Sequence, residues 1–445
     1  MNTPIVDFVK NYIKKGQTRA HMPGHKGQAF LGFEPFDITE FDGADCLYSP
    51  SGIIAESEKN ASALFGANTF YSAEGSSQCI RAMLYLALKD AKNAQKPYVL
   101  AGRNAHKSFI TALGLLDIDV LWLYPDDEKD SYLSCSIDTV KLDLTLSSCK
   151  TLPIAVYITT PDYLGNTADI KGISKVCKKH GVKLLVDNAH GAYLKFLCPS
   201  CHPIDLGADM CCDSAHKTLP AITGSAYLHL SKDAPKELVS QVKLAMSIFG
   251  STSPSYLILQ SLDAINKYID DGYTEKLSEF IKEVKLVKTE LTKHGYTLIG
   301  NEPLKITIKA KNFGYTGIEF NQLLKKQDII CEFYDPDYLV MMVTPESGNA
   351  TLKKIKRVLT AIVKRTVIDQ SAPIPKKTEQ VISVKNALLS QTETVDVENS
   401  LGKIFADISV TCPPAVPIIV CGERINESTI NCLKYYGQTT CKVIK

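Results

Sequence analysis

Lys217 has the surroundings in this sequence that most suggest chemistry, because Ser214, His216 and Thr218 flank it between two apolar segments. A lysine between apolar strands is rare unless it is paired or reactive, since its ammonium group must leave water. Such a lysine can attack an aldehyde and form a Schiff base. An isolated lysine is ordinarily a solvated surface residue, so this interpretation depends on the groups that accompany Lys217.

A possible anion site lies in the turn formed by Gly75, Ser76 and Ser77, before an apolar segment that we predict to be a helix from about Cys79. A turn of this kind presents backbone N–H groups and two hydroxyls at the positive end of the helix dipole, where a phosphate binds well. Taken alone, the turn is more simply explained as a helix N-cap.

Two further side chains follow apolar segments that we predict to be strands. Asp187 ends the run 184–187, three residues before His190, and its carboxylate could hold a cation or cap a turn. His106 follows the run 98–101 and could lie flat against an aromatic ligand or be an ordinary loop histidine.

Together these features match what pyridoxal phosphate (PLP) requires of a protein. The cofactor needs a lysine for its aldehyde, an anion cup for its phosphate, a carboxylate for its pyridine nitrogen and a group packed on its ring. Lys217, the turn 75–77, Asp187 and His106 supply these four in that order. The combination outweighs the ordinary explanation of each part, so we predict a PLP site.

The elements that must position these residues alternate between strands and helices. Strands are predicted at 98–101, 119–123, 154–159, 182–186 and 226–230, and helices at 107–116, 170–180, 235–248, 255–269 and 275–294. Short apolar strands separated by helices indicate a mainly parallel sheet covered on both faces. Ligands of such open α/β sheets bind where the strands end. We therefore predict an α/β fold whose large domain contains this sheet.

Beyond Gly295 the pattern changes to that of a smaller α+β region. Strands are predicted at 296–299, 304–309, 329–333 and 338–343, a helix at 317–326, a linker at 367–377 and another strand after Pro417. We divide the chain into an N-terminal segment (1–60), a PLP-binding large domain (61–290), a small α+β domain (291–366), and a linker with a C-terminal domain (367–445).

Composition excludes several classes of protein. The chain has 445 residues, is 45% hydrophobic and carries a formal net charge of +2, so no global field favours nucleic acid or anionic lipid. No apolar run approaches the roughly 20 residues that span a bilayer. The first 17 residues mix charged and apolar side chains, unlike a signal peptide. We expect a cytoplasmic enzyme with no nucleic-acid or membrane partner.

The sequence has 14 cysteines and two closely spaced histidines that could form metal or redox sites. We interpret the cysteines as small buried hydrophobes of a reducing compartment. Cys198, Cys201 and His202 have the spacing of a haem attachment site, a redox pair or a zinc pair, but haem attachment normally requires export, for which we find no signal, and we favour none of the three. His21 and His25 are four residues apart, but the proline and glycine between them prevent the helix that would align them. We predict no metal site.

The sequence resembles the bacterial Orn/Lys/Arg decarboxylases, PLP-dependent enzymes of the aspartate aminotransferase fold (fold type I). The similar stretches are 21–27 (HMPGHKG), 160–165, 187–192 (DNAHGA) and 214–220 (SAHKTLP). The strings HMPGHKG and HKTLP are specific to that family. The N-terminal wing domain of its acid-inducible members has no counterpart here, so we expect the short form.

The resemblance implies a role for each matching residue. Lys217 would bind the cofactor's aldehyde, Asp187 would pair with the pyridinium nitrogen, His106 would stack on the ring, and Lys217 or His216 would protonate the product carbon. The other cofactor contacts would be Gly75, Ser76, Ser77, His190, Ser214, His216 and Thr252. In the family a Ser/Thr loop from the partner subunit reaches the phosphate, and residues 251–254 are its counterpart. We therefore expect a homodimer with shared active sites.

The implied reaction removes CO2 from arginine, lysine or ornithine and yields agmatine, cadaverine or putrescine, as in polyamine biosynthesis. Glu332, Asp335 and Asp45 are candidates for binding the distal cation of the substrate.

Two alternatives remain open. An aminotransferase typically anchors the substrate carboxylate with an arginine on a small-domain strand, but this sequence has no arginine between Arg103 and Arg357. A decarboxylase has the opposite need, because a firmly ion-paired carboxylate resists the loss of CO2. A non-catalytic PLP-binding paralog is suggested by Glu74 and Asn188, where the family commonly has other residues.

Overall fold

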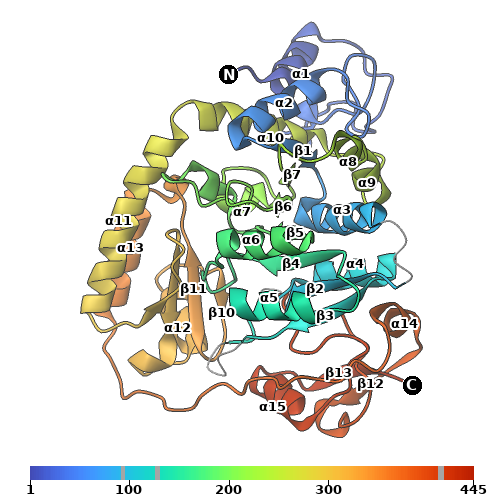
Figure 1. Ribbon diagram of the computed structural model, residues 1–445. Coiled ribbons are helices and arrows are strands. Elements are labelled where there is room, and N and C mark those ends of the chain that lie inside the picture. The colour runs from blue at the N-terminus through green and yellow to red at the C-terminus, as the bar shows by residue number, and fades with distance from the viewer. Residues whose placement is uncertain (92–95, 126–130, 409–414) are drawn as a thin grey trace. The chain divides into compact units, whose positions relative to one another are not determined.

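The computed structural model describes residues 1–91, 96–125, 131–408 and 415–445 of the chain (Figure 1). The chain divides into two compact units, one formed by Met1–Ala94 with Cys177–Lys276 and the other by Gln95–Val176 with Leu277–Lys445. Within the described ranges, no helix combines the length and the apolar character needed to cross a membrane.

The first unit contains strands of the large sheet and the helices that pack on them. Its elements are α1 (Pro4–Lys15), η1 (Glu34–Phe36), α2 (Ile53–Phe65), β1 (Asn68–Ser72), α3 (Gly75–Asp90), β5 (Lys183–Asp187), η2 (Ala192–Phe196), β6 (Met210–Asp213), α7 (Ala215–Thr218), β7 (Ala226–Leu230), α8 (Lys236–Ser240), α9 (Val242–Ile248) and α10 (Tyr256–Asp270). Helix α3 packs across β5, β6 and β7. All residues of β6 and β7 are buried, as expected of strands covered on both faces.

The second unit contains the remaining strands of that sheet and two smaller sheets. Its elements are β2 (Tyr98–Gly102), α4 (Lys107–Leu116), β3 (Asp119–Leu123), α5 (Thr139–Ser148), β4 (Ala155–Thr159), β8 (Leu298–Ile299), β9 (Lys305–Lys309), η3 (Ala310–Phe313), α12 (Gly317–Lys325), β10 (Phe333–Tyr334), β11 (Tyr338–Met342), η4 (Pro345–Ser347), α13 (Gly348–Ala361), α14 (Val384–Leu389), β12 (Thr392–Asp396), η5 (Val397–Asn399), α15 (Glu427–Tyr435) and β13 (Thr440–Ile444). Helices α6 (Ile170–His180) and α11 (Tyr273–Lys293) cross the unit boundaries.

The large sheet has seven strands in the order β1–β7–β6–β5–β4–β2–β3. Strand β7 is antiparallel to both of its neighbours, whereas the pairs β5–β6, β2–β4 and β2–β3 are parallel. The predicted α/β fold with a mainly parallel sheet is therefore confirmed. A four-stranded antiparallel sheet, β10–β11–β9–β8, belongs to the smaller α+β region.

Several predicted elements were wrong, and local hydrogen bonds explain two of them. The predicted strand 329–333 is mostly a loop after α12, in which the N–H of Ile329 donates to the carbonyl of Leu324 at 3.1 Å, and only Phe333 lies in a strand, β10. The predicted strand after Pro417 is a turn, in which the N–H of Val420 donates to Glu423 Oε2 at 2.8 Å. The predicted helix 235–248 is two helices, α8 and α9. Strands β1 and β6 were not predicted.

Candidate active site

Lys217 lies on α7, a four-residue helix that follows β6 and has Ser214 at its N-cap position. The lysine is half-buried, and its Nζ lies 3.0 Å from Nε2 of His190. His190 is buried and comes three residues after the end of β5. The ends of β5 and β6, which pair in parallel, thus bring together a lysine and an imidazole predicted separately from the sequence.

His216 is held in its neutral form. Its Nδ1 lies 3.0 Å from the carbonyl oxygen of Ser225 and must donate to it. Burial lowers the pKa of His216, and the nearby charge of Lys217 lowers it further. The hydrogen bond to the Ser225 carbonyl raises the pKa, but the net shift is downward. A neutral imidazole with a proton on Nδ1 leaves Nε2 as a lone-pair acceptor.

The turn at the start of α3 meets the start of α7. The hydroxyls of Ser76 and Ser214 are 2.9 Å apart. Gly75 has a φ of +71°, and its N–H donates to the carbonyl of Gly224 at 2.8 Å. A Cβ added to Gly75 would meet nothing within 4 Å, so there is open space at this turn. Two hydroxyls beside a helix N-terminus with space in front suit a phosphate group.

Asp187 is the last residue of β5 and is 2% exposed. Its Oδ1 accepts a hydrogen bond from the N–H of Ala189 at 3.2 Å and lies 3.7 Å from Sγ of Cys212. The predicted placement of this carboxylate at the end of a buried strand is confirmed. Such a carboxylate can keep a nearby ring nitrogen protonated.

A network of buried hydrogen bonds centred on Asp213 was not predicted from the sequence. Asp213 Oδ2 lies 3.0 Å from His202 Nε2 and 3.2 Å from His229 Nε2, and its Oδ1 accepts from the side chain of Asn188 at 2.7 Å. Burial raises the pKa of Asp213, but the two histidines lower it more, and the net shift is downward. His202 and His229 lie 11 and 16 residues from Asp213, so no local motif links them.

His106 lies in the second unit, at the N-cap of α4. Its Nδ1 accepts a hydrogen bond from the N–H of Ser108 at 3.1 Å, so the imidazole caps the helix that follows β2. Stacking of His106 on the cofactor ring stays a prediction.

Thr252 lies in an exposed segment of the first unit. The N–H of the preceding Ser251 donates to Oε1 of Glu74 at 3.3 Å, and Glu74 is the N-cap residue of α3. The loop therefore lies beside the same helix start that carries Ser76, and a contact with the partner subunit stays a prediction.

The three candidates for the distal substrate cation differ in their surroundings. Asp45 accepts hydrogen bonds at 2.9 Å from the N–H groups of Gly52 and Ile54 at the start of α2. Its carboxylate therefore caps this helix. Glu332 is exposed and accepts a hydrogen bond from the hydroxyl of Tyr163 at 2.7 Å. Asp335 is 7% exposed, and burial raises its pKa to about 7.

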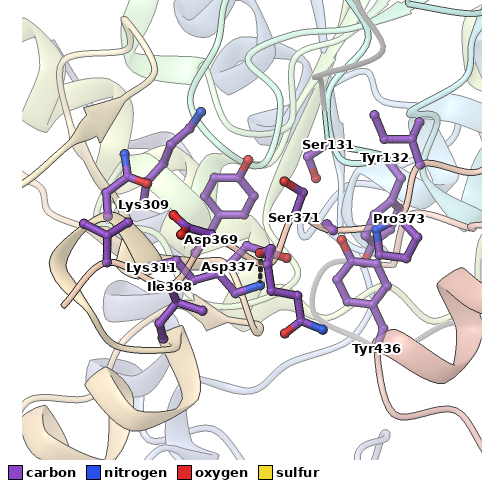
Figure 2. Close-up of a pocket in the computed structure, with 16 residues that line it drawn as sticks. Ser131, Tyr132, Lys309, Lys311, Asp337, Ile368, Asp369, Ser371, Pro373 and Tyr436 are labelled. Carbon is purple, nitrogen blue, oxygen red and sulfur yellow. Dashed lines mark hydrogen bonds and ion pairs between the residues drawn. The ribbon is translucent and has the colours of Figure 1, made fainter. Parts of the chain in front are cut away.

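A cavity of about 520 Å³ lies in the second unit, next to Asp337 (Figure 2). It is lined by Ser131, Tyr132, Lys309, Lys311, Asn312, Asp337, Tyr338, Val367, Ile368, Asp369, Gln370, Ser371, Ala372, Pro373, Ile374 and Tyr436. Lys311 Nζ is paired with Asp337 Oδ1 at 2.8 Å. None of the predicted cofactor-binding residues belongs to this lining, so the cavity is not the PLP cup.

Comparison with known proteins identifies the family. Residues 3–310 match the family model described as "Orn/Lys/Arg decarboxylase, major domain", and residues 368–442 match that of the C-terminal domain. The chain belongs to the Orn/Lys/Arg decarboxylase family. The resemblance based on the motifs around Lys217 and Asp187 is thereby confirmed, and the chain is a PLP-dependent carboxy-lyase.

The Orn/Lys/Arg decarboxylase relatives match this chain over nearly its whole length. It is 30% identical to the uncharacterized protein YaaO of Bacillus subtilis, covering 97% of this chain and 93% of that protein. It is 27% identical to a protein named arginine decarboxylase from Halalkalibacterium halodurans, covering 96% and 92%. A lysine decarboxylase structure from Francisella novicida has a TM-score of 0.81 at 17% identity, covering 100% of this chain and 81% of that one. The likeness confirms the predicted fold type I.

The residues of the first unit fit the family's cofactor. The Ser76–Ser214 hydroxyl pair at the start of α3 suits its phosphate, and the buried Asp187 suits its ring nitrogen. Lys217 is half-buried beside an imidazole rather than extended into solvent.

Proposed function

We propose that this chain decarboxylates a basic amino acid, arginine, lysine or ornithine, with pyridoxal phosphate, and releases CO2 with agmatine, cadaverine or putrescine. The observation that carries the proposal is the 3.0 Å contact between Lys217 and His190, in the same unit as Asp187 and the Ser76–Ser214 pair. Relatives named arginine decarboxylase, at 26–27% identity, support arginine as one of the three candidate substrates.

Each of the predicted site residues would have a separate role in binding the cofactor. When bound, pyridoxal phosphate supplies an electron sink for the electrons left by departing CO2. Asp187 would hold the proton on the ring nitrogen, and Ser76, Ser77 and Ser214 would hold the phosphate. His106 would pack on the ring.

A proton must also reach the product carbon. His190 Nε2 can exchange a proton with Lys217 Nζ across 3.0 Å. Lys217, or the neutral His216 after it takes up a proton, would then donate to the carbon that lost CO2.

Oligomeric state and biological setting are part of the same proposal. The exposed segment around Thr252 supports a homodimer in which each subunit completes the phosphate site of its partner. A cytoplasmic location and a part in polyamine synthesis follow from the family resemblance alone.

A substrate panel tests the proposal. Purified, PLP-loaded protein is given arginine, lysine, ornithine or a neutral amino acid, while CO2 is followed and products are identified by mass spectrometry. We expect CO2 and the matching amine from one basic amino acid, and a loss of at least about 10³-fold in Lys217→Ala. Transfer of the amino group to a 2-oxo acid without CO2 would favour an aminotransferase. A cofactor reducible onto Lys217 with no product would favour a non-catalytic paralog.

A further inference from the structure

Two cysteines differ from the others in their exposure. Among the cysteines that the structure describes, only Cys198 and Cys201 are exposed, and neither is in a disulfide. Most of the other described cysteines are buried, as interpreted from the sequence, whereas this pair is not. Accessible thiols close in sequence have the arrangement of a redox pair, in which one thiol resolves the oxidised form of the other.

The loop that carries the pair folds back on itself. The backbone bends through Leu197, Cys198 and Pro199, and the N–H of Cys201 donates to the carbonyl of Leu194 at 3.0 Å. An extended chain would place residues three apart at a separation of about 10 Å. A disulfide needs roughly 4.4–6.8 Å between the two Cα atoms, which a bent segment can reach and an extended one cannot.

The loop is linked to the cofactor-binding strand end through buried side chains. His202 directly follows Cys201, is fully buried, and contacts Asp213 at 3.0 Å. Asp213 in turn accepts a hydrogen bond from Asn188 at 2.7 Å, and Asn188 follows Asp187 in the chain. A change in the backbone at Cys201 therefore reaches the neighbour of Asp187 through two hydrogen bonds.

The surroundings of the pair favour a disulfide over a bound metal. Within the described part of the chain, three residues bring possible ligand atoms close enough together to hold a metal ion: His202, Cys211 and Asp213. Neither Cys198 nor Cys201 belongs to this group. Structural zinc sites need four ligands.

We propose that Cys198 and Cys201 form a redox-active dithiol, which small-molecule disulfides oxidise, and that the oxidised loop weakens retention of the cofactor. A thiolate of the pair attacks the small disulfide, forms a mixed disulfide and releases one thiol. The second cysteine displaces the second thiol, so the pair loses two electrons and two protons and the oxidant gains them. The effect on the cofactor rests on the function proposed above, whereas the oxidation does not.

The first test is a mass measurement. The reduced holoenzyme is incubated with oxidised glutathione, alkylated and digested. We expect the peptide containing both cysteines to escape alkylation and to be about 2 Da lighter than the unmodified dithiol peptide, reversibly with dithiothreitol. Cys198→Ser and Cys201→Ser should each abolish this difference, and Cys331→Ser, at a half-buried cysteine of the second unit, should leave it intact. An unchanged peptide, a disulfide to another cysteine, or stoichiometric zinc on the reduced protein that Cys198→Ser removes would overturn the proposal.

The second test separates the effect on the cofactor from the oxidation. PLP loss during dialysis is followed by absorbance for the reduced and oxidised protein. We expect a severalfold faster loss after oxidation, and no change on treating Cys201→Ser. Equal rates despite the 2 Da loss would overturn the link to the cofactor alone, while a reduced protein that never binds PLP would instead overturn the proposed function.

Discussion

At the residue scale, the contact between Lys217 and His190 constrains the charge of the site. At 3.0 Å, one of the two nitrogens must donate and the other accept, so the pair carries at most one positive charge. The neighbouring His216 is neutral, because burial and Lys217 lower its pKa. A site with little fixed positive charge around the lysine suits decarboxylation, since it does not clamp the substrate carboxylate in an ion pair.

The buried Asp213 should contribute strongly to stability. Asp213→Asn replaces one acceptor oxygen by an amide that donates, so the carboxamide cannot serve His202, His229 and Asn188 together. We expect a loss of about 2–4 kcal/mol, measured by urea unfolding at pH 7. Asp233→Asn, at an exposed aspartate of the same unit, is the control and should change stability by less than about 0.5 kcal/mol. Equal midpoints for the two variants would contradict the network.

Local motifs explain which residues of the site could be predicted. Lys217, Ser214 and His216 are contiguous, and Asp187 stands at the end of an apolar run, so the sequence alone indicates their chemistry. The partners of Asp213 come from elsewhere in the chain and are brought together by the pairing of β6 with β7 and the loop before β6. His229 in the sequence is an ordinary strand residue, and only the sheet register places it beside Asp213.

At the element scale, α1 is capped by another helix. Thr3 makes no side-chain cap bond, and the N–H groups of Ile5 and Val6 instead donate to Oδ2 of Asp263 on α10, at 2.9 and 3.0 Å. Ile5 and Asp263 are 258 residues apart, so no local pattern in the sequence indicates this capping. Strands β1 and β6 were not predicted for a related reason. A run of four or five residues is too short to indicate a strand by its own pattern, because packing against neighbouring strands determines its conformation.

The same carboxyl group should make stability depend on pH. Burial raises the pKa of Asp263 to about 6, although Ser57 and the N–H groups of α1 lower it. Because the folded pKa lies above the unfolded value of about 3.9, its contribution is complete below pH 3.9 and is lost as the pH rises through 6. Asp263→Asn does not titrate and should gain roughly 1–3 kcal/mol relative to the native protein between pH 4.5 and 7.5.

Urea midpoints across that pH range measure the gain. Asp271→Asn, at an exposed position just past α10, controls for the removal of a carboxylate in general. Parallel pH profiles for the native protein and Asp263→Asn would show that this carboxyl group does not titrate there.

At the scale of the whole molecule, the alternation of apolar runs and helical stretches was enough to predict an α/β fold with a mainly parallel sheet. The order β1–β7–β6–β5–β4–β2–β3 was not predictable, because β1, first in the chain, pairs antiparallel with the last strand of the sheet. The division at residues 60, 290 and 366 stays a prediction, and so does the sharing of sites between subunits.

Shared active sites make a distinctive prediction for mixed dimers. If Thr252 completes the phosphate site of the partner subunit, Lys217→Ala and Thr252→Ala subunits should each be impaired alone. A heterodimer of the two contains one site with a native Lys217 and a native Thr252, and one site with neither. Heterodimers purified through two different tags should therefore regain about half of the native activity. If Thr252 instead serves its own subunit, both sites of the heterodimer carry one defect, and the activity stays at the mean of the two variants.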